Sequence, residues 1–92
     1  DTDVILGVNT RVELADIAGK MRGRILRDLM LSGVTIEDPA TTYVDAGVTV
    51  GADSVLEPMT KLVGRTVIGA DCTIRMGTVI ADSAVGDGCK VG

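Results

Sequence analysis

The 92-residue chain carries a net charge of −4, is 46% apolar, and contains one aromatic residue and no histidine. The missing histidine excludes Ser–His and Cys–His nucleophile pairs and histidine-ligated zinc, and two cysteines are too few for a four-thiolate metal site. The acidic balance and the scarcity of aromatic side chains argue against a nucleic-acid partner, and no apolar run approaches the length that membrane insertion needs. Because a disulfide-stapled secreted module would carry more cysteines, we expect a cytoplasmic protein.

The N-terminal third of the sequence predicts one long helix. Thr10 and Glu13 have the spacing of a capping box, in which the Thr10 hydroxyl accepts a hydrogen bond from the Glu13 amide. Apolar residues then recur at steps of three and four along one helical face: Leu14, Ile17, Met21, Ile25 and Leu29. Gly33 stands where a glycine commonly ends a helix, so we expect a helix over residues 12–31, preceded by an extended segment over residues 4–8.

After Pro39 the sequence changes to a six-residue period. An aliphatic residue occupies every sixth position: Val44, Val50, Leu56, Leu62, Ile68, Ile74 and Ile80. A small or β-branched residue stands four positions after each of them: Val48, Ser54, Thr60, Thr66, Cys72, Thr78 and Ala84. After Ile80 one step shortens to five residues, and the period resumes at Val85 and Val91.

A six-residue period fits neither an α-helix, which repeats near 3.6 residues, nor a single strand, which repeats at two. Six residues suffice for a short strand and a turn, and three such units close a triangular coil of 18 residues. Successive coils then stack at strand spacing, with the aliphatic residues in interior columns and the small residues inward near the corners. The chain is therefore predicted to be mainly β, a parallel β-helix of hexapeptide repeats preceded by a single long α-helix.

The two cysteines, Cys72 and Cys89, both fall in the small inward position, one coil apart once the five-residue step is counted. We expect two buried, reduced thiols that act as small apolar fillers, and the alternative is a redox pair. Rapid thiol labelling of the folded chain would distinguish the two.

The repeats counted from Val44 amount to about 2.7 coils, fewer than the three repeats that a solenoid usually needs. The final coil reaches residue 92 in mid-turn, and such an end would leave an unpaired strand edge. We therefore expect an oligomer to cover the faces of the β-helix and the natural chain to continue.

Two strings carry a resemblance to a known family: residues 7–14 (GVNTRVEL) and residues 33–45 (GVTIEDPATTYVD). With the helix between them and the hexapeptides after them, they resemble the junction region of GlmU, the bacterial family of bifunctional N-acetylglucosamine-1-phosphate uridyltransferases and glucosamine-1-phosphate N-acetyltransferases. The resemblance extends over the whole chain and implies a left-handed β-helix. It divides the chain into the end of a nucleotidyltransferase domain (residues 1–11), a linker helix (residues 12–33) and the first coils of an incomplete acetyltransferase domain (residues 34–92).

The resemblance carries one site residue over to this sequence. In the family the asparagine of the Gly-Val-Asn string, here Asn9, contacts Mg²⁺ and the product UDP-N-acetylglucosamine. An amide oxygen suits Mg²⁺, which takes hard oxygen ligands and is usually held together with substrate phosphates. Judged from its neighbours alone, Asn9 would instead shape the turn into the helix. Since the family's other functional residues lie outside this segment, we expect no catalytic residue here, no Mg²⁺ binding by the chain alone, and no activity.

The resemblance further implies a parent enzyme that assembles as a homotrimer through its β-helix. Its substrates would be acetyl-CoA and glucosamine-1-phosphate for acetyl transfer, and UTP and N-acetylglucosamine-1-phosphate for uridylyl transfer. The product, UDP-N-acetylglucosamine, would serve peptidoglycan synthesis. Two alternatives stay open: a stand-alone trimeric β-solenoid scaffold without chemistry of its own, and another hexapeptide acyltransferase or sugar nucleotidyltransferase.

Overall fold

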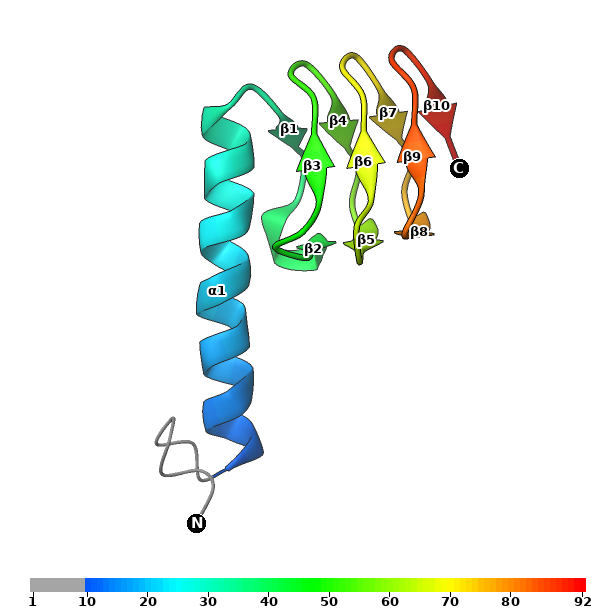
Figure 1. Cartoon of the computed structure of the whole chain (residues 1–92). Helices are drawn as coiled ribbons and strands as arrows, with labels where there is room; N and C mark the ends of the chain where they lie inside the picture. Colours follow the sequence, from blue (N-terminus) through cyan, green and yellow to red (C-terminus); the bar gives the residue numbers. More distant parts are fainter. Residues whose placement is uncertain (1–9) are drawn as a thin grey trace.

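The computed structural model describes residues 10–92, so Asn9 and the segment expected to be extended over residues 4–8 lie outside the described residues. Within the described part, one α-helix is followed by short strands that coil away from the C-terminal half of the helix (Figure 1). The elements in chain order are α1 (Arg11–Leu31), β1 (Thr35–Ile36), the short 3-10 helix η2 (Pro39–Thr41), β2 (Tyr43–Val44), β3 (Thr49–Val50), β4 (Val55–Leu56), β5 (Lys61–Val63), β6 (Val67–Ile68), β7 (Thr73–Ile74), β8 (Val79–Ala81), β9 (Ala84–Val85) and β10 (Lys90–Val91).

Helix α1 begins and ends at the residues that the sequence analysis singled out. The Thr10 hydroxyl accepts a hydrogen bond from the Glu13 amide at 3.1 Å, which confirms the predicted N-cap. At the other end, Gly33 adopts a φ of 102°, and its amide donates to the Met30 carbonyl at 3.2 Å. This left-handed residue after the last turn is the usual place of glycine in a helix C-cap, because other residues are strained there. The predicted long helix is confirmed.

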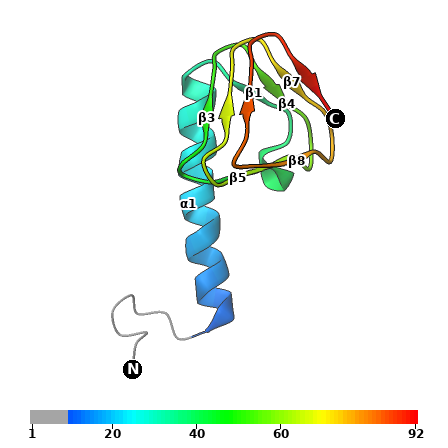
Figure 2. The same ribbon diagram turned by 45° about the vertical axis from the view of Figure 1, so that its right-hand side comes forward.

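The strands form three parallel sheets, one for each side of the coil (Figures 1 and 2). The strand orders are β1-β4-β7-β10, β2-β5-β8 and β3-β6-β9. Each strand pairs with the strand three places further along the chain, so neighbours within a sheet are one full turn apart. This topology confirms the predicted fold class, a left-handed parallel β-helix preceded by one long α-helix.

The register between strands gives the length of each coil. In the middle of the chain Thr49 pairs with Val67, 18 positions further on, as the six-residue period predicts. The first coil is longer: Thr35 pairs with Val55, 20 positions further on. The extra length accommodates η2. A later coil is one residue shorter, because Val67 pairs with Ala84 across the predicted five-residue step.

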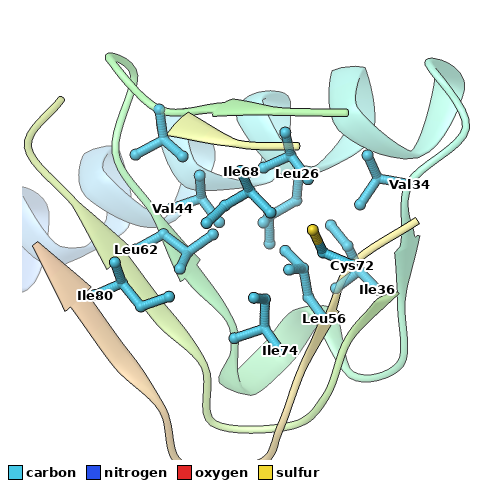
Figure 3. Packing of buried hydrophobic residues seen from close by; sticks show 12 residues of the cluster. Leu26, Val34, Ile36, Val44, Leu56, Leu62, Ile68, Cys72, Ile74 and Ile80 are labelled. Carbon is cyan, nitrogen blue, oxygen red and sulfur yellow. The ribbon is translucent and has the colours of Figure 1, made fainter. Parts of the chain in front are cut away.

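The interior of the coils is filled with aliphatic side chains (Figure 3). All the predicted inward aliphatic residues are buried: Val44, Val50, Leu56, Leu62, Ile68, Ile74 and Ile80. Helix α1 adds Leu26 to the same cluster, and β1 adds Ile36. Full burial of one such side chain contributes roughly 1.5–3 kcal/mol, so this column is the main source of stability in a chain with a single aromatic residue.

Hydroxyl groups at the small inward positions donate hydrogen bonds to backbone carbonyl oxygens. Thr60 and Thr66 are fully buried, and each donates to the carbonyl three residues earlier at 2.8 Å. The Ser54 hydroxyl donates to the Gly69 carbonyl at 2.8 Å and accepts from the Cys72 amide at 3.1 Å, which connects successive coils. Because a buried polar group without a partner costs about 1–3 kcal/mol, these positions favour Ser and Thr as well as small size.

Two inward positions near the last coil differ from the prediction. Ala84 is exposed, because the five-residue step brings it into register with Val67, an outward-facing residue. Cys72 is buried as expected, but Cys89 is exposed, so the prediction of two buried thiols is wrong for Cys89. Within the described residues, no further coil packs on top of the one that carries Cys89.

Carboxylates at the corners of the coils accept hydrogen bonds from backbone amides of the neighbouring coil. Four such bonds have lengths of 2.9–3.1 Å and join Asp45 to Gly64, Glu57 to Met76, Asp82 to Arg65, and Asp87 to Ala70. Turn amides cannot join the strand ladders, and a charged acceptor makes a stronger bond than a neutral one. Part of the acidic excess of the chain therefore has a structural role.

Candidate functional site

Asn9, the site residue implied by the family resemblance, lies outside the described residues, so its role stays a prediction. Within residues 10–92, no three His, Cys, Asp or Glu side chains come together as a group that could hold a metal ion. The corner carboxylates lie on different coils and bind backbone amides, as Asp45 and Asp87 illustrate. The described residues thus do not fit a Mg²⁺ site by themselves.

The C-terminal half of α1 covers the first coil of the β-helix. Leu26 is 2% exposed, and Ile25 and Leu29 pack half-buried against the same cluster. The N-terminal half of the helix extends past the coil (Figure 1), and its apolar residues Leu14 and Ile17 are exposed. The apolar face predicted from the sequence is therefore covered in one half of α1 and uncovered in the other.

A groove with a volume of about 340 Å³ lies between α1 and the first coil. The Arg22 guanidinium carbon lies 4.3 Å from the centroid of the Tyr43 ring, which is a cation–π distance, and the pair joins α1 to β2. The groove is lined by Ala18, Met21, Arg22, Ile25, Tyr43, Val44, Asp45 and Ala46.

The polar groups of this groove have structural partners. Arg22 stacks on Tyr43, and the Asp45 carboxylate accepts a hydrogen bond from the Gly64 amide at 3.0 Å. The first contact joins the helix to the first coil, and the second joins the first coil to the next one. The lining contains no Ser, Thr, Cys, Lys or His side chain. Sequence reasoning did not pair Arg22 with Tyr43, because the two residues lie on different elements. The sequence held one indication of such a contact: Tyr43 is the sole aromatic residue of the chain, and so the sole side chain on which a cation can stack.

The fold and this junction define the class of the protein: a parallel β-helix of hexapeptide repeats whose first coil is covered by a helix. Among residues 10–92, no helix combines the length and the apolar character needed to cross a bilayer. No protein-family model matches the chain.

Similar curated proteins are named bifunctional protein GlmU. The chain is 46% identical over 91 residues to the GlmU of Mycobacterium tuberculosis (strain ATCC 25177 / H37Ra), 46% to that of Pelobacter propionicus, and 47% to that of Caldanaerobacter subterraneus subsp. tengcongensis. Each similarity covers 99% of this chain but 18–20% of the relative, so the chain spans about a fifth of the length of these relatives. The resemblance to a segment of GlmU is thus confirmed.

Proposed function

We propose that the chain forms the linker helix and the first β-helix coils of a GlmU-type enzyme, where it has a structural and trimerising role. The whole enzyme would transfer an acetyl group from acetyl-CoA to glucosamine-1-phosphate, and a uridylyl group from UTP to N-acetylglucosamine-1-phosphate. Its product would be UDP-N-acetylglucosamine, a peptidoglycan precursor. The observation that carries this proposal is the 46% identity over 91 residues to a segment of proteins named GlmU.

The packing of the described residues supports a structural role for this segment. Its interior is occupied by aliphatic side chains such as Leu56 and Leu62, which have no exposed surface. Its buried hydroxyls and corner carboxylates are used in backbone hydrogen bonds, as Thr60 and Asp82 show. Apart from the contact proposed below for Asn9, the chemistry of both reactions would then depend on residues elsewhere in the enzyme.

The proposed assembly is a cytoplasmic homotrimer formed through the outer faces of the β-helix. Val67 on β6 and Val79 on β8 face outward, with exposed fractions of 47% and 64%. Met59 and Met76 are exposed as well, near the turn between β4 and β5 and its counterpart one coil later. Burial of outward apolar side chains between subunits would stabilise such an assembly by about 25 cal/mol per Å² of apolar surface.

Asn9 is proposed to contact Mg²⁺ and the nucleotide-sugar product when the upstream part of the enzyme is present. Its amide oxygen is a neutral, hard ligand of the kind that Mg²⁺ accepts beside substrate phosphates.

A segment exchange tests the proposed function. The matching 91 residues of the Mycobacterium tuberculosis GlmU would be replaced by those of this chain, and both transfer reactions and the sedimentation of the chimera would be measured. We expect a trimeric chimera that retains acetyl transfer and uridylyl transfer. A folded chimera that has lost both reactions would contradict the proposal and favour the stand-alone scaffold.

Asn9→Ala in the same chimera tests the site residue. Loss of a metal and product contact predicts a decrease in uridylyl transfer of about tenfold or more. Acetyl transfer, measured on the same preparation, serves as the internal control and should not change. Equal decreases in both reactions would indicate a folding defect, and unchanged uridylyl transfer would show that Asn9 only shapes the turn.

A further inference from the structure

The groove between α1 and the first coil is not used by the structural role proposed above. One wall is the face of α1 that carries Ala18, Met21 and Ile25, and the other is the segment over residues 43–46. Both walls consist of described residues, and the successive coils extend away from α1 (Figure 1). The shape of the groove is therefore set by α1 and the first coil alone.

Most of the groove lining is apolar. Ala18, Met21 and Ile25 line it from the helix, and Val44 and Ala46 line it from the coil. Its volume of about 340 Å³ is near the lower end of the range of pockets that hold small molecules, roughly 300–1,000 Å³. The groove is therefore suited to a small, flat apolar body such as an aromatic ring.

Arg22 is the single basic residue of the lining, and it is half-buried. Its guanidinium carbon lies 4.3 Å from the centroid of the Tyr43 ring, and such a cation–π contact uses none of the N–H donors. Within residues 10–92, no carboxylate or carbonyl oxygen accepts a hydrogen bond from this guanidinium. A positioned cation whose donors have no protein acceptor is suited to bind an anion.

The acidic residue of the lining, Asp45, has its partner on the next coil. Its Oδ2 accepts a hydrogen bond from the Gly64 amide at 3.0 Å, so the carboxylate is directed toward that coil. It forms no ion pair with Arg22. The groove thus combines apolar walls with one cation that no described carboxylate neutralises.

We propose that this groove is a binding site for an aromatic carboxylate. The carboxylate pairs with Arg22, because the planar set of N–H donors on a guanidinium matches the two oxygen atoms of a carboxylate. The ring lies against Met21 and Ile25, and the Met21 thioether makes a favourable contact with an aromatic ring. Because the ligand contacts α1 and the first coil together, its binding joins the two elements more firmly.

Titration of the 92-residue chain with cinnamate, followed by the backbone amide signals in nuclear magnetic resonance, tests the proposal. Cinnamamide, which has nearly the same shape but no charge, is the matched probe. Cinnamate should shift the amide signals of Ala18 and Ala46 and bind about tenfold or more tightly than cinnamamide, because its hydrogen bonds to Arg22 are charge-assisted. Equal affinity for the two probes, or shifts confined to residues outside the groove, would overturn the proposal.

Two pairs of variants assign the binding to the groove. Arg22→Gln should lower the affinity for cinnamate about tenfold, whereas Arg24→Gln removes the same charge from an exposed residue outside the lining and should leave it unchanged. Ala18→Leu keeps Arg22 and fills the space of the ring, so it should also weaken binding, and Ala15→Leu, outside the lining, should not. Leucine is a good helix former, so both leucine variants should stay folded. Undiminished binding in Ala18→Leu, or equal losses in Arg22→Gln and Arg24→Gln, would contradict the proposal.

The segment-exchange chimera described above tests whether the groove is accessible in a whole enzyme. Calorimetric titration of the chimera with cinnamate should show a binding component that Arg22→Gln removes and Arg24→Gln keeps. Binding by the 92-residue chain but not by the folded chimera would show that another part of the enzyme occupies the groove, and the proposal would then fail.

Discussion

The two ends of the β-helix are built from the same repeat but differ in how far their inward residues are covered. Beside α1, Val34 and Val44 are 3% and 4% exposed. At the far end, Val85 and Val91 are only half-buried and Cys89 is exposed, although Cys72, one coil below, is 1% exposed. Burial of an inward residue is thus set by what lies above and below its coil.

Helix α1 covers the first coil of the β-helix, as a further coil would do. Leu26 is almost fully buried, and Ile25 and Leu29 lie against the same cluster, so the first coil has an apolar partner on its outer side. The Arg22–Tyr43 contact adds a cation–π interaction of about 0.5–1 kcal/mol at an exposed position. At the far end, no described element has this role.

The largest expected effect concerns the interior column. Leu56→Ala should lower the free energy of unfolding by about 3–5 kcal/mol, because Leu56 has no exposed surface and lies between covered coils. Val85→Ala, at the far end, should cost about 1 kcal/mol, since its side chain is only half-buried. Urea denaturation of both variants measures the difference, and equal losses would show that the far end is covered as fully as the middle of the β-helix.

The covering helix provides the next comparison. Leu26→Ala should destabilise the chain by about 2–3 kcal/mol, because it removes the α1 side chain that is buried against the first coil. Leu14→Ala on the uncovered half of the same helix is the matched control and should change stability by no more than about 0.5 kcal/mol. Thermal unfolding monitored by circular dichroism measures both. A loss at Leu14 as large as that at Leu26 would mean that the N-terminal half of α1 is also packed.

Two glycines should respond to alanine with opposite signs. At Gly51 a Cβ atom would lie 2.5 Å from the Ala70 amide nitrogen and 2.6 Å from the Gly69 carbonyl carbon, so Gly51→Ala should cost about 1–3 kcal/mol. A Cβ atom at Gly23 in α1 would have no atom within 4 Å apart from its own stretch of helix, so Gly23→Ala should stabilise the helix by up to about 1 kcal/mol. Urea midpoints that shift in the same direction for both variants would contradict this account of inter-coil packing.

The sequence was sufficient to predict most of the fold, because the features involved are local or strictly periodic. Thr10 and Gly33 marked the two ends of the helix, and the six-residue spacing identified the interior column. The longer first coil was not predicted, since η2 interrupts the period before it begins. The exposure of Cys89 was missed because the repeat predicts which way a residue points but not whether a neighbouring coil covers it.

The candidate site was less predictable than the fold. The Arg22–Tyr43 contact joins a helix to a strand, and no spacing within one element relates the two residues. Asn9 was assigned through the family resemblance, and it lies outside the described residues. A contact between elements depends on how they pack, which a local pattern does not specify.

Amide hydrogen exchange within residues 10–92 tests the central claim, that α1 covers the first coil while no described element covers the last one. Four amides donate to the next coil with the same bond length, 2.9 Å: those of Thr35 and Tyr43 near the helix, and those of Thr73 and Val67 near the far end. Since the bonds are alike, their exchange rates report how easily each end opens. In the reduced chain, Thr35 and Tyr43 are expected to exchange about tenfold or more slowly than Thr73 and Val67. Exchange that is equally slow at both pairs, or slower at Thr73 and Val67, would contradict the account.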